Sequence, residues 1–165
     1  MLCDPPWLYS NWKDKAHGSS KPHYQSMTDD EIIHLPVNRI TGENAALFLW
    51  ITWPMLATGI HVDIMESWGF RPVTCGLTWN KVYRNSAPYC GLGFYTRSGS
   101  EPCLLGIKGR MPRKSKSVYQ TITAPVGKHS VKPVEQYSRI ESLFDGPYIE
   151  LFSRYEHEGW TTWGR

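Results

Sequence analysis

The chain has 165 residues, of which 41% are hydrophobic and 20% charged, with a net charge of +3, which is typical of one soluble globular domain over residues 1–165. Its most apolar stretch, AALFLWITWPMLATGI, is too short to cross a bilayer comfortably, and the N-terminus lacks a signal-peptide pattern, so we expect a cytoplasmic protein without a membrane segment. The four cysteines have neither metal-ligand spacing nor that of a disulfide framework, which argues against a metal site and fits a reducing compartment.

The N-terminal part predicts a short strand, a loop and a helix. Met1–Cys3 is typical of the end of a buried strand, and the turn Asp-Pro-Pro-Trp follows it at the carboxyl edge. Lys13–Gln25 is polar and rich in Gly, Ser, His and Lys, which predicts a mobile loop. Thr28-Asp-Asp-Glu31 has the pattern of a capping box, so a short helix should start there and end at Pro36.

The middle of the chain predicts a strand–helix–strand unit. Leu47–Trp53 is a continuous apolar run, as expected for a fully buried strand. Pro54 suits the first turn of a helix that Gly69 would end, with apolar residues four apart on one face: Ile60, Ile64 and Trp68. Val73–Trp79 then resumes as a strand.

The last third of the chain predicts more strands and one helix. Phe94–Arg97 and Pro102–Ile107 should pair through the Ser-Gly-Ser turn between them. Pro133 opens a helix whose inward face should consist of Val134, Tyr137, Ile140 and Phe144. Tyr148–Phe152 is a strong final strand before the aromatic segment Trp160–Trp163.

This alternation of strands and helices predicts an α/β fold with a largely parallel central sheet. In such sheets, functional groups gather at the carboxyl ends of the strands. Two strand ends are followed by polar, chemically reactive residues, in the segments LCDPPW and ELFSR. A shared edge would bring them together, and we therefore look for the functional site there.

The Asp-Pro-Pro-Trp turn suits methyl transfer to an amine on an aromatic ring. The lone pair of such a nitrogen is delocalised, so it is a poor nucleophile. The Asp4 carboxylate and the Pro5 carbonyl could accept its two N–H bonds and expose the lone pair, on a backbone that two prolines keep rigid. Trp7 could stack on the base, which is worth about 1–3 kcal/mol. Asp-Pro-Pro is also a common turn without a catalytic role.

Basic residues are concentrated between Glu101 and Glu135, a stretch without any acid. Its first part, KGRMPRKSKS, is punctuated by Gly, Pro and Ser, which predicts a loop. Such a loop could follow a phosphate backbone, with Lys114 and Lys116 as contacts. The same pattern suits a solvated surface loop.

Seven segments carry a family resemblance over nearly the whole chain: DPPW, LFLWIT, WGFRPVTCGLTWNK, GFYTRSGSEPCLLGIKG, HSVKPVEQYSRIESL, ELFSR and GWTTWG. In this order they resemble the N6-adenine methyltransferases, and within these the branch of the eukaryotic messenger-RNA adenosine methyltransferase and its phage and bacterial DNA-methylating relatives. The resemblance implies a Rossmann-like class I fold with helices on both faces, the catalytic motif ahead of the cofactor strand, and S-adenosylmethionine as methyl donor. The strand before Asp4 is shorter than in the family, and the chain ends in Trp-Gly-Arg165 where relatives continue Trp-Gly-Asn.

The resemblance also implies roles for individual residues. The catalytic motif is matched by Asp4, Pro5, Pro6 and Trp7, and Asp4 would also contact the amine of the cofactor's methionine part. Lys132 would meet the cofactor carboxylate. The cofactor strand and the ribose contacts would be provided by Glu150, Phe152, Arg154, Tyr155, Glu156 and His157. The acceptor pocket would be lined by Trp7, Tyr9, Trp79 and Glu101.

Three functions follow from this interpretation. The first is methylation of adenine N6 in DNA, on a base that is flipped out or single-stranded. The second is N6-methylation of adenosine in RNA, which the same residues would serve. The third is a non-catalytic, nucleic-acid-binding partner subunit in a heterodimer. Whichever function holds, the protein could form a homodimer, or a heterodimer with a related methyltransferase-fold subunit. DNA is preferred because the sequence shows no RNA-binding regions beside the methyltransferase segments and because small relatives occur in phages. With DNA as substrate, we expect the protein at the nucleoid of a bacterium or of a phage-infected cell.

Overall fold

The computed structural model describes residues 1–8, 26–93, 95–127 and 131–164. Its elements are, in chain order, β1 (Leu2–Cys3), α1 (Asp29–Ile33), the 3-10 helix η2 (Val37–Arg39), β2 (Ala45–Trp50), α2 (Trp53–Thr58), α3 (Ile60–Ser67), β3 (Arg71–Val82), β4 (Ser100–Lys108), β5 (Thr121–Pro125), α4 (Glu135–Leu143), β6 (Tyr148–Leu151) and β7 (Trp160–Trp163). None of the helices in the described part of the chain has the length and hydrophobicity that crossing a bilayer would need.

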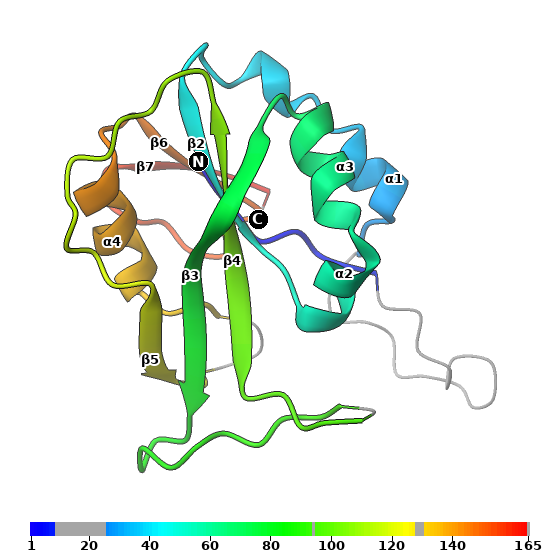
Figure 1. Ribbon diagram of the computed structural model, residues 1–165, viewed down its shortest axis with the longest axis vertical. Helices are drawn as coiled ribbons and strands as arrows, with labels where there is room; N and C mark the ends of the chain where they lie inside the picture. The colour runs from blue at the N-terminus through cyan, green and yellow to red at the C-terminus, as the bar shows by residue number, and fades with distance from the viewer. Residues whose placement is uncertain (9–25, 94, 128–130, 165) are drawn as a thin grey trace.

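The strands form one seven-stranded sheet in the order β5-β3-β4-β2-β1-β6-β7 (Figure 1). Strand β1 is parallel to both of its neighbours, and the pairs β6–β7 and β3–β5 are parallel as well. Strand β4 is antiparallel to β2 and β3. The sheet is therefore mixed but mostly parallel, which confirms the predicted α/β class.

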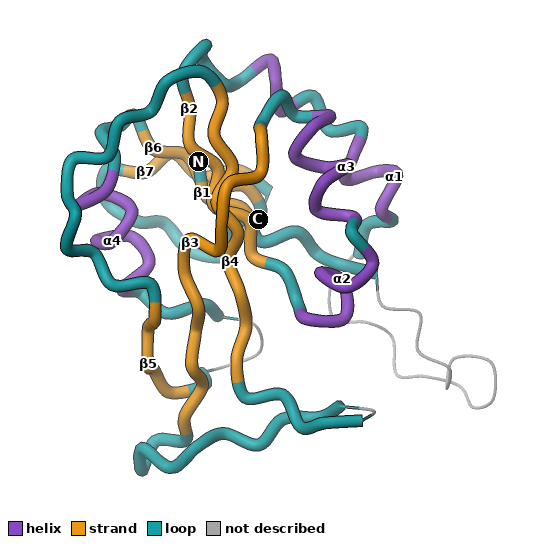
Figure 2. Tube along the Cα trace, viewed as in Figure 1, coloured by secondary structure: helices purple, strands orange, loops and turns teal. Residues whose placement is uncertain are grey.

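The core lies on both faces of the sheet because successive side chains of a strand point to opposite sides. In β2 and the residue after it, Leu47, Leu49 and Ile51 join the cluster with α1 and α3. Phe48 and Trp50 join the opposite cluster with α4. Figure 2 shows the helices α1, α2 and α3 on one side of the sheet and α4 on the other. The expectation of helices on both faces is thus confirmed.

The first helices begin and end largely as their sequences predict. Thr28 and Glu31 form the expected capping box, with the Glu31 backbone N–H donating to Thr28 Oγ1 at 3.2 Å and the Thr28 N–H donating to Glu31 Oε2 at 2.8 Å. Pro54 lies in the first turn of α2. The single helix expected up to Gly69 is wrong, because Gly59 has φ +84° and separates α2 from α3.

Two other expectations need correction. The strand predicted at Phe94–Arg97 is absent from its described residues, 95–97, and β4 instead pairs with β2 and β3. Val134 is 65% exposed, since it precedes the first turn of α4, whereas Ile140 of that helix and Phe144 at its end are buried. The first expectation is wrong because β4 pairs with β2 and β3 instead of with the segment just before it. The second is wrong because α4 starts at Glu135, one residue after Val134.

The topology brings the ends of six strands and the start of β4 to a single edge. Cys3 is opposite Leu151 in the register of β1 and β6, so the segments that follow these strands start side by side. Because β4 is antiparallel, its first residues reach the same edge, where Ile51 N donates to Pro102 O at 3.1 Å. The predicted shared edge of LCDPPW and ELFSR is confirmed.

Candidate active site

Four charged side chains form an alternating line at this edge. Lys132 Nζ lies 2.8 Å from Asp4 Oδ2 and 3.0 Å from Glu101 Oε1, and Lys81 Nζ lies 2.9 Å from Glu101 Oε2. The line therefore runs Asp4, Lys132, Glu101, Lys81, and its formal charges sum to zero. Only 7% of the Lys132 side chain and 16% of the Asp4 side chain are exposed, so these pairs are poorly screened by solvent.

The sheet explains how residues far apart in sequence meet here. Asp4 follows β1, Glu101 is the second residue of β4, and Lys132 precedes α4. Trp79 is opposite Glu101 in the register of β3 and β4, and Lys81 lies two residues further, on the same face as Trp79. The two ammonium groups also lie over indole rings: Lys81 is 4.8 Å from the centroid of Trp79, and Lys132 is 5.5 Å from that of Trp50.

Burial and pairing set the protonation states of these groups. Burial raises the pKa of Asp4 above its usual value, and the nearby Lys132 offsets only part of this. Burial alone would also raise the pKa of Glu101, but Lys132 and Lys81 together outweigh it, so its pKa is lowered. Burial would lower the pKa of Lys132, and the two carboxylates reverse this and raise it. Of the two carboxyl groups, Asp4 is therefore the better proton acceptor.

The Asp-Pro-Pro-Trp turn is held by backbone hydrogen bonds. Trp7 N donates to the Pro5 carbonyl at 2.9 Å, and Met27 N donates to the Pro6 carbonyl at 2.9 Å. The Pro5 carbonyl thus already accepts one N–H, and its second lone pair is what a substrate amine could use. The arrangement keeps the carbonyl next to the Asp4 carboxylate rigid.

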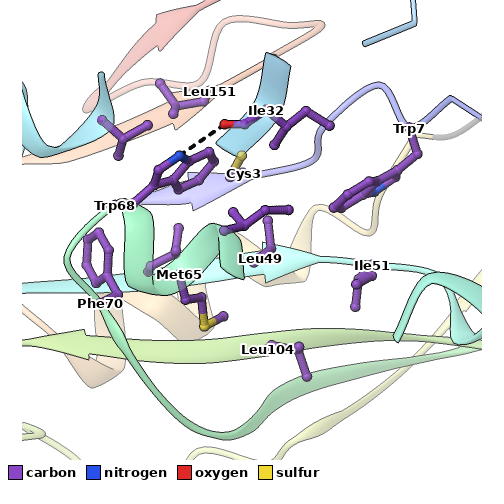
Figure 3. Close-up of a cluster of buried hydrophobic side chains, with 13 residues drawn as sticks. Cys3, Trp7, Ile32, Leu49, Ile51, Met65, Trp68, Phe70, Leu104 and Leu151 are labelled. Carbon is purple, nitrogen blue, oxygen red and sulfur yellow. Dashed lines mark hydrogen bonds between the residues drawn. The ribbon is translucent and has the colours of Figure 1, made fainter. Parts of the chain in front are cut away.

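Trp7 lies in the core rather than on an open wall. Its indole is 8% exposed and belongs to the cluster with Cys3 and Ile51 (Figure 3). Its Nε1 is buried and has no hydrogen-bond partner among the described residues. The surface left for stacking on a base is small. Tyr9, the other aromatic residue expected here, lies outside the described residues.

Two residues of the expected cofactor segment, Glu150 and His157, contact α4. Glu150 is 8% exposed, and its Oε2 accepts hydrogen bonds from Tyr137 OH at 2.9 Å and from Ser153 Oγ at 3.0 Å. Burial raises the pKa of Glu150 despite these bonds. His157 stacks on Tyr137 with ring centroids 3.9 Å apart. Both side chains therefore attach the end of β6 and the loop after it to α4.

The remaining residues of that segment have different environments. Phe152 has a left-handed backbone, φ +60°, and its ring contacts Trp163 edge-on at 5.5 Å. Arg154 is close enough to Asp4 to lower its pKa, against the larger effect of burial. Tyr155 is 58% exposed, and Glu156 is exposed too. The structure thus brings Arg154 to the Asp4 edge and leaves Tyr155 and Glu156 at the surface.

The predicted acceptor-side residues separate into two groups. Trp79 and Glu101 lie at the edge with Asp4; Trp79 is 4% exposed, and its Nε1 donates to Ala124 O at 2.9 Å. Lys114 and Lys116 lie in the loop that follows the far end of β4. That end of the strand is seven residues after Glu101, which is roughly 20 Å at the rise of a strand. Lys114 Nζ pairs there with Asp145 Oδ1 at 2.7 Å. The structure does not bring these lysines to the site; their loop covers a cavity of about 520 Å³ beside β3 and β4.

Sequence reasoning missed Lys81 and the surface of the β3–β4 loop. The described residues of this loop, 83–93 and 95–99, extend from the Asp4 edge away from the rest of the molecule (Figure 1). Its exposed side chains include aromatic, aliphatic and basic ones: Tyr83, Arg84, Leu92, Tyr95 and Arg97. The density of aromatic residues after the TWNK motif was a signal that could have identified it.

The donor set of the site fits the amino-acid end of S-adenosylmethionine. A methionine group carries an ammonium and a carboxylate, and the site offers a carboxylate, Asp4, and an ammonium, Lys132, within one ion pair. The Lys132 ammonium has three N–H donors, of which two are directed to Asp4 and Glu101, so the third can reach a ligand carboxylate. Among the described residues, histidine, cysteine, aspartate and glutamate form no group of three that could hold a metal ion.

Comparison with known proteins agrees with this geometry. The model of the MT-A70 family matches residues 1–165. The chain is 33% identical over 183 residues to the type II methyltransferase M.MunI of a Mycoplasma species, covering 99% of this chain and 75% of that protein. It is 29% identical to an N(6)-adenosine-methyltransferase MT-A70-like protein of Arabidopsis thaliana and 24% identical to the human N(6)-adenine-specific methyltransferase METTL4.

The lengths of these relatives differ. The chain spans 23% of the Arabidopsis protein and 36% of METTL4, although 99% of the chain is aligned in both cases. The matched region is therefore the part that these larger proteins have in common with the chain. The expected family is confirmed: the chain belongs to the MT-A70 family of N6-adenine methyltransferases, whose methyl donor is S-adenosylmethionine.

Proposed function

We propose that this protein transfers a methyl group from S-adenosylmethionine to the exocyclic N6 amine of adenine in DNA. The observation that carries the proposal is the buried Asp4–Lys132 pair at the carboxyl edge of the sheet, directly before a rigid proline carbonyl. DNA is favoured by the extent of the match, since the chain spans 75% of the type II methyltransferase but only 23% of the Arabidopsis N(6)-adenosine-methyltransferase-like protein.

Asp4 and the Pro5 carbonyl prepare the amine for attack. Each accepts one N–H of the adenine amine, which favours a pyramidal nitrogen with its lone pair directed at the donor. When bound, S-adenosylmethionine supplies an electrophilic methyl group, and the electrons of its carbon–sulfur bond stay on sulfur. The nitrogen gives up one N–H proton as the new N–C bond forms. Asp4 can receive it because burial raises the pKa of this carboxyl group.

Lys132 and Arg154 provide positive charge on the donor side. The third N–H of Lys132 is directed at the donor's carboxylate, while the Asp4 carboxylate attracts its ammonium. Holding donor and acceptor together is itself a large contribution to rate, because it removes the loss of translational and rotational freedom from the reaction step. These residues need only align the reactants and provide complementary charge.

The β3–β4 loop is the proposed contact with the nucleic acid. It leaves the same edge as Asp4, and Tyr83 and Tyr95 are 41% and 100% exposed. Exposed aromatic rings next to arginines are suited to stacking on unpaired bases and to following a phosphate backbone. The loop therefore favours a base presented outside a closed duplex, either flipped out or single-stranded.

RNA is the second candidate substrate, since the Arabidopsis relative bears the name of an N(6)-adenosine-methyltransferase. A non-catalytic partner subunit is the third, and it would not require the Asp4–Lys132 pair. A homodimer or heterodimer and a cytoplasmic, nucleoid-associated location are part of the proposal as well.

Methyl transfer from tritiated S-adenosylmethionine to single-stranded DNA, duplex DNA and RNA, followed by nucleoside analysis, tests the proposal. We expect label in N6-methyladenine from DNA, and more from single strands than from duplex. Asp4→Asn should abolish it, whereas Asp63→Asn, an exposed substitution on α3, should not. Label in RNA alone would make the second candidate correct. No label on any substrate, with oligonucleotide binding retained, would favour the partner subunit.

A further inference from the structure

Lys81 occupies the outer end of the line of charges. Its Nζ lies 2.9 Å from Glu101 Oε2 and 4.8 Å from the centroid of the Trp79 ring. The side chain is 21% exposed, and that of Glu101 is 11% exposed. Lys81 thus contacts neither Asp4 nor Lys132, and any effect on them must pass through Glu101.

Glu101 is held by two cations through two different oxygens. Oε2 faces Lys81 on β3, and Oε1 faces Lys132 before α4. With both oxygens engaged, the carboxylate cannot rotate without breaking one ion pair. Lys132 is in turn divided between Glu101 and Asp4, at 3.0 and 2.8 Å. The position of the Lys132 ammonium therefore depends on how firmly Glu101 competes for it.

We propose that Lys81 is a positioning residue for the methyl-transfer site: it keeps Glu101 ionised and oriented, so that Lys132 is shared between Glu101 and Asp4 instead of being bound by Asp4 alone. This inference rests on the proposed function. By sharing Lys132, Glu101 leaves more of the Asp4 carboxylate available to the adenine amine.

Removing the Lys81 ammonium leaves Glu101 with one cation in a buried environment. Burial then favours its neutral form, and a neutral Glu101 attracts Lys132 far less. Lys132 shifts towards Asp4, whose hydrogen bond to the amine weakens. The other charged or titratable groups that act on these two carboxyls are Arg154, Glu150 and the buried thiols of Cys3 and Cys103.

The sign of the pH effect follows. Lys81 helps to lower the pKa of Glu101, so without it that pKa rises and Glu101 becomes protonated at a higher pH. Activity that needs ionised Glu101 is then lost at a higher pH during acidification. A rise of about one pKa unit corresponds to a tenfold change in the ionised-to-neutral ratio at a given pH.

The test compares Lys81→Met with Lys81→Arg, and uses Lys108→Met as a matched control. Lys108 is at the far end of β4, where its Nζ donates to Thr41 Oγ1 at 3.1 Å. Two readouts are needed for the whole chain: the pH profile of kcat and KM for methyl transfer, and the titration of the ¹³C-labelled Glu101 carboxyl by NMR, without substrate. Thermal unfolding establishes that each variant is folded.

We expect Lys81→Met to move the acid limb of the kcat profile up by about one unit, so that kcat on that limb falls by up to about tenfold while the KM for the donor changes less. The Glu101 titration should move by the same amount, Lys81→Arg should restore both, and Lys108→Met should change neither. An unchanged Glu101 titration, or a loss of kcat that is equal at every pH and not rescued by arginine, would overturn the inference. If the wild-type protein shows no methyl transfer, the proposed function fails, and the NMR titration alone still decides whether Lys81 holds Glu101 ionised.

Discussion

Lys132→Met should destabilise the fold by about 3 kcal/mol at pH 7. It removes the positive charge that pairs with the poorly exposed carboxylates of Asp4 and Glu101. The Lys132–Asp4 and Lys132–Glu101 distances of 2.8 and 3.0 Å correspond to attractions of about 6 kcal/mol each at an effective dielectric constant of about 20. Burial of the ammonium offsets much of this. Removal of one partner from a buried pair costs about 3–5 kcal/mol in other proteins, and we expect the lower end because Glu101 keeps Lys81.

The pH dependence makes this prediction specific. Asp4 already has a raised pKa, and without Lys132 it should rise further. A carboxyl group whose folded-state pKa lies above its unfolded value favours folding below the unfolded pKa, and this advantage is lost as the pH rises through the folded value. The deficit of Lys132→Met should therefore shrink between pH 7 and pH 5, as Asp4 becomes neutral.

Urea unfolding followed by tryptophan fluorescence at pH 5, 6, 7 and 8 measures this deficit. Adding Asp4→Asn to Lys132→Met should recover part of the lost stability, because it removes the unpaired charge. Lys108→Met serves as the control for loss of a lysine. A loss of stability below about 1 kcal/mol at pH 7 would refute the reasoning, because an exposed ion pair contributes about as much. A loss that does not decrease between pH 7 and pH 5 would refute it as well.

Three further predictions follow from the fold and the site. Asp4→Asn should lower kcat at least about 100-fold while thermal denaturation still shows a folded protein; a variant retaining a tenth of the activity would show that the carboxylate is not needed. Gly59→Ala should destabilise by about 1–2 kcal/mol in urea, since φ is +84° there while no atom lies within 4 Å of the added Cβ; equal stability would contradict the cost of the left-handed backbone. Replacing Arg84 and Arg97 with Ala should reduce the slope of log K against log salt concentration for oligonucleotide binding by about one per lost phosphate contact, whereas Lys114→Ala should change this slope less. A larger change for Lys114→Ala than for the two arginines would place the nucleic acid at the other edge of the sheet.

Local sequence signals predicted the features that depend on neighbouring residues. The capping box at Thr28 and the proline in the first turn of α2 are both present, because each depends on hydrogen bonds or dihedral angles within one turn. The neighbouring ends of β1 and β6 followed from a general property of parallel sheets. The pairing of β4 could not be predicted in the same way, since its partner β2 is distant in sequence and the long loop between β3 and β4 carries no tight-turn signal.

The candidate site was predictable only in part. Asp4, Lys132 and Glu101 followed from the family resemblance, and the structure joins them in one line of ion pairs. Lys81 was missed because a lysine in a strand looks like any solvated lysine until its cross-strand partner is known. Lys114 was assigned to the nucleic acid by charge density alone, which does not tell at which end of the sheet a loop lies.

Calorimetric titration with S-adenosylhomocysteine tests most directly whether the Asp4–Lys132 pair holds the amino-acid end of the methyl donor. The account predicts measurable binding to the wild-type protein, at least tenfold weaker binding to Lys132→Met at a pH where that variant is folded, and unchanged binding to Lys108→Met. Wild-type affinity in Lys132→Met, or no binding to the wild-type protein at all, would contradict it.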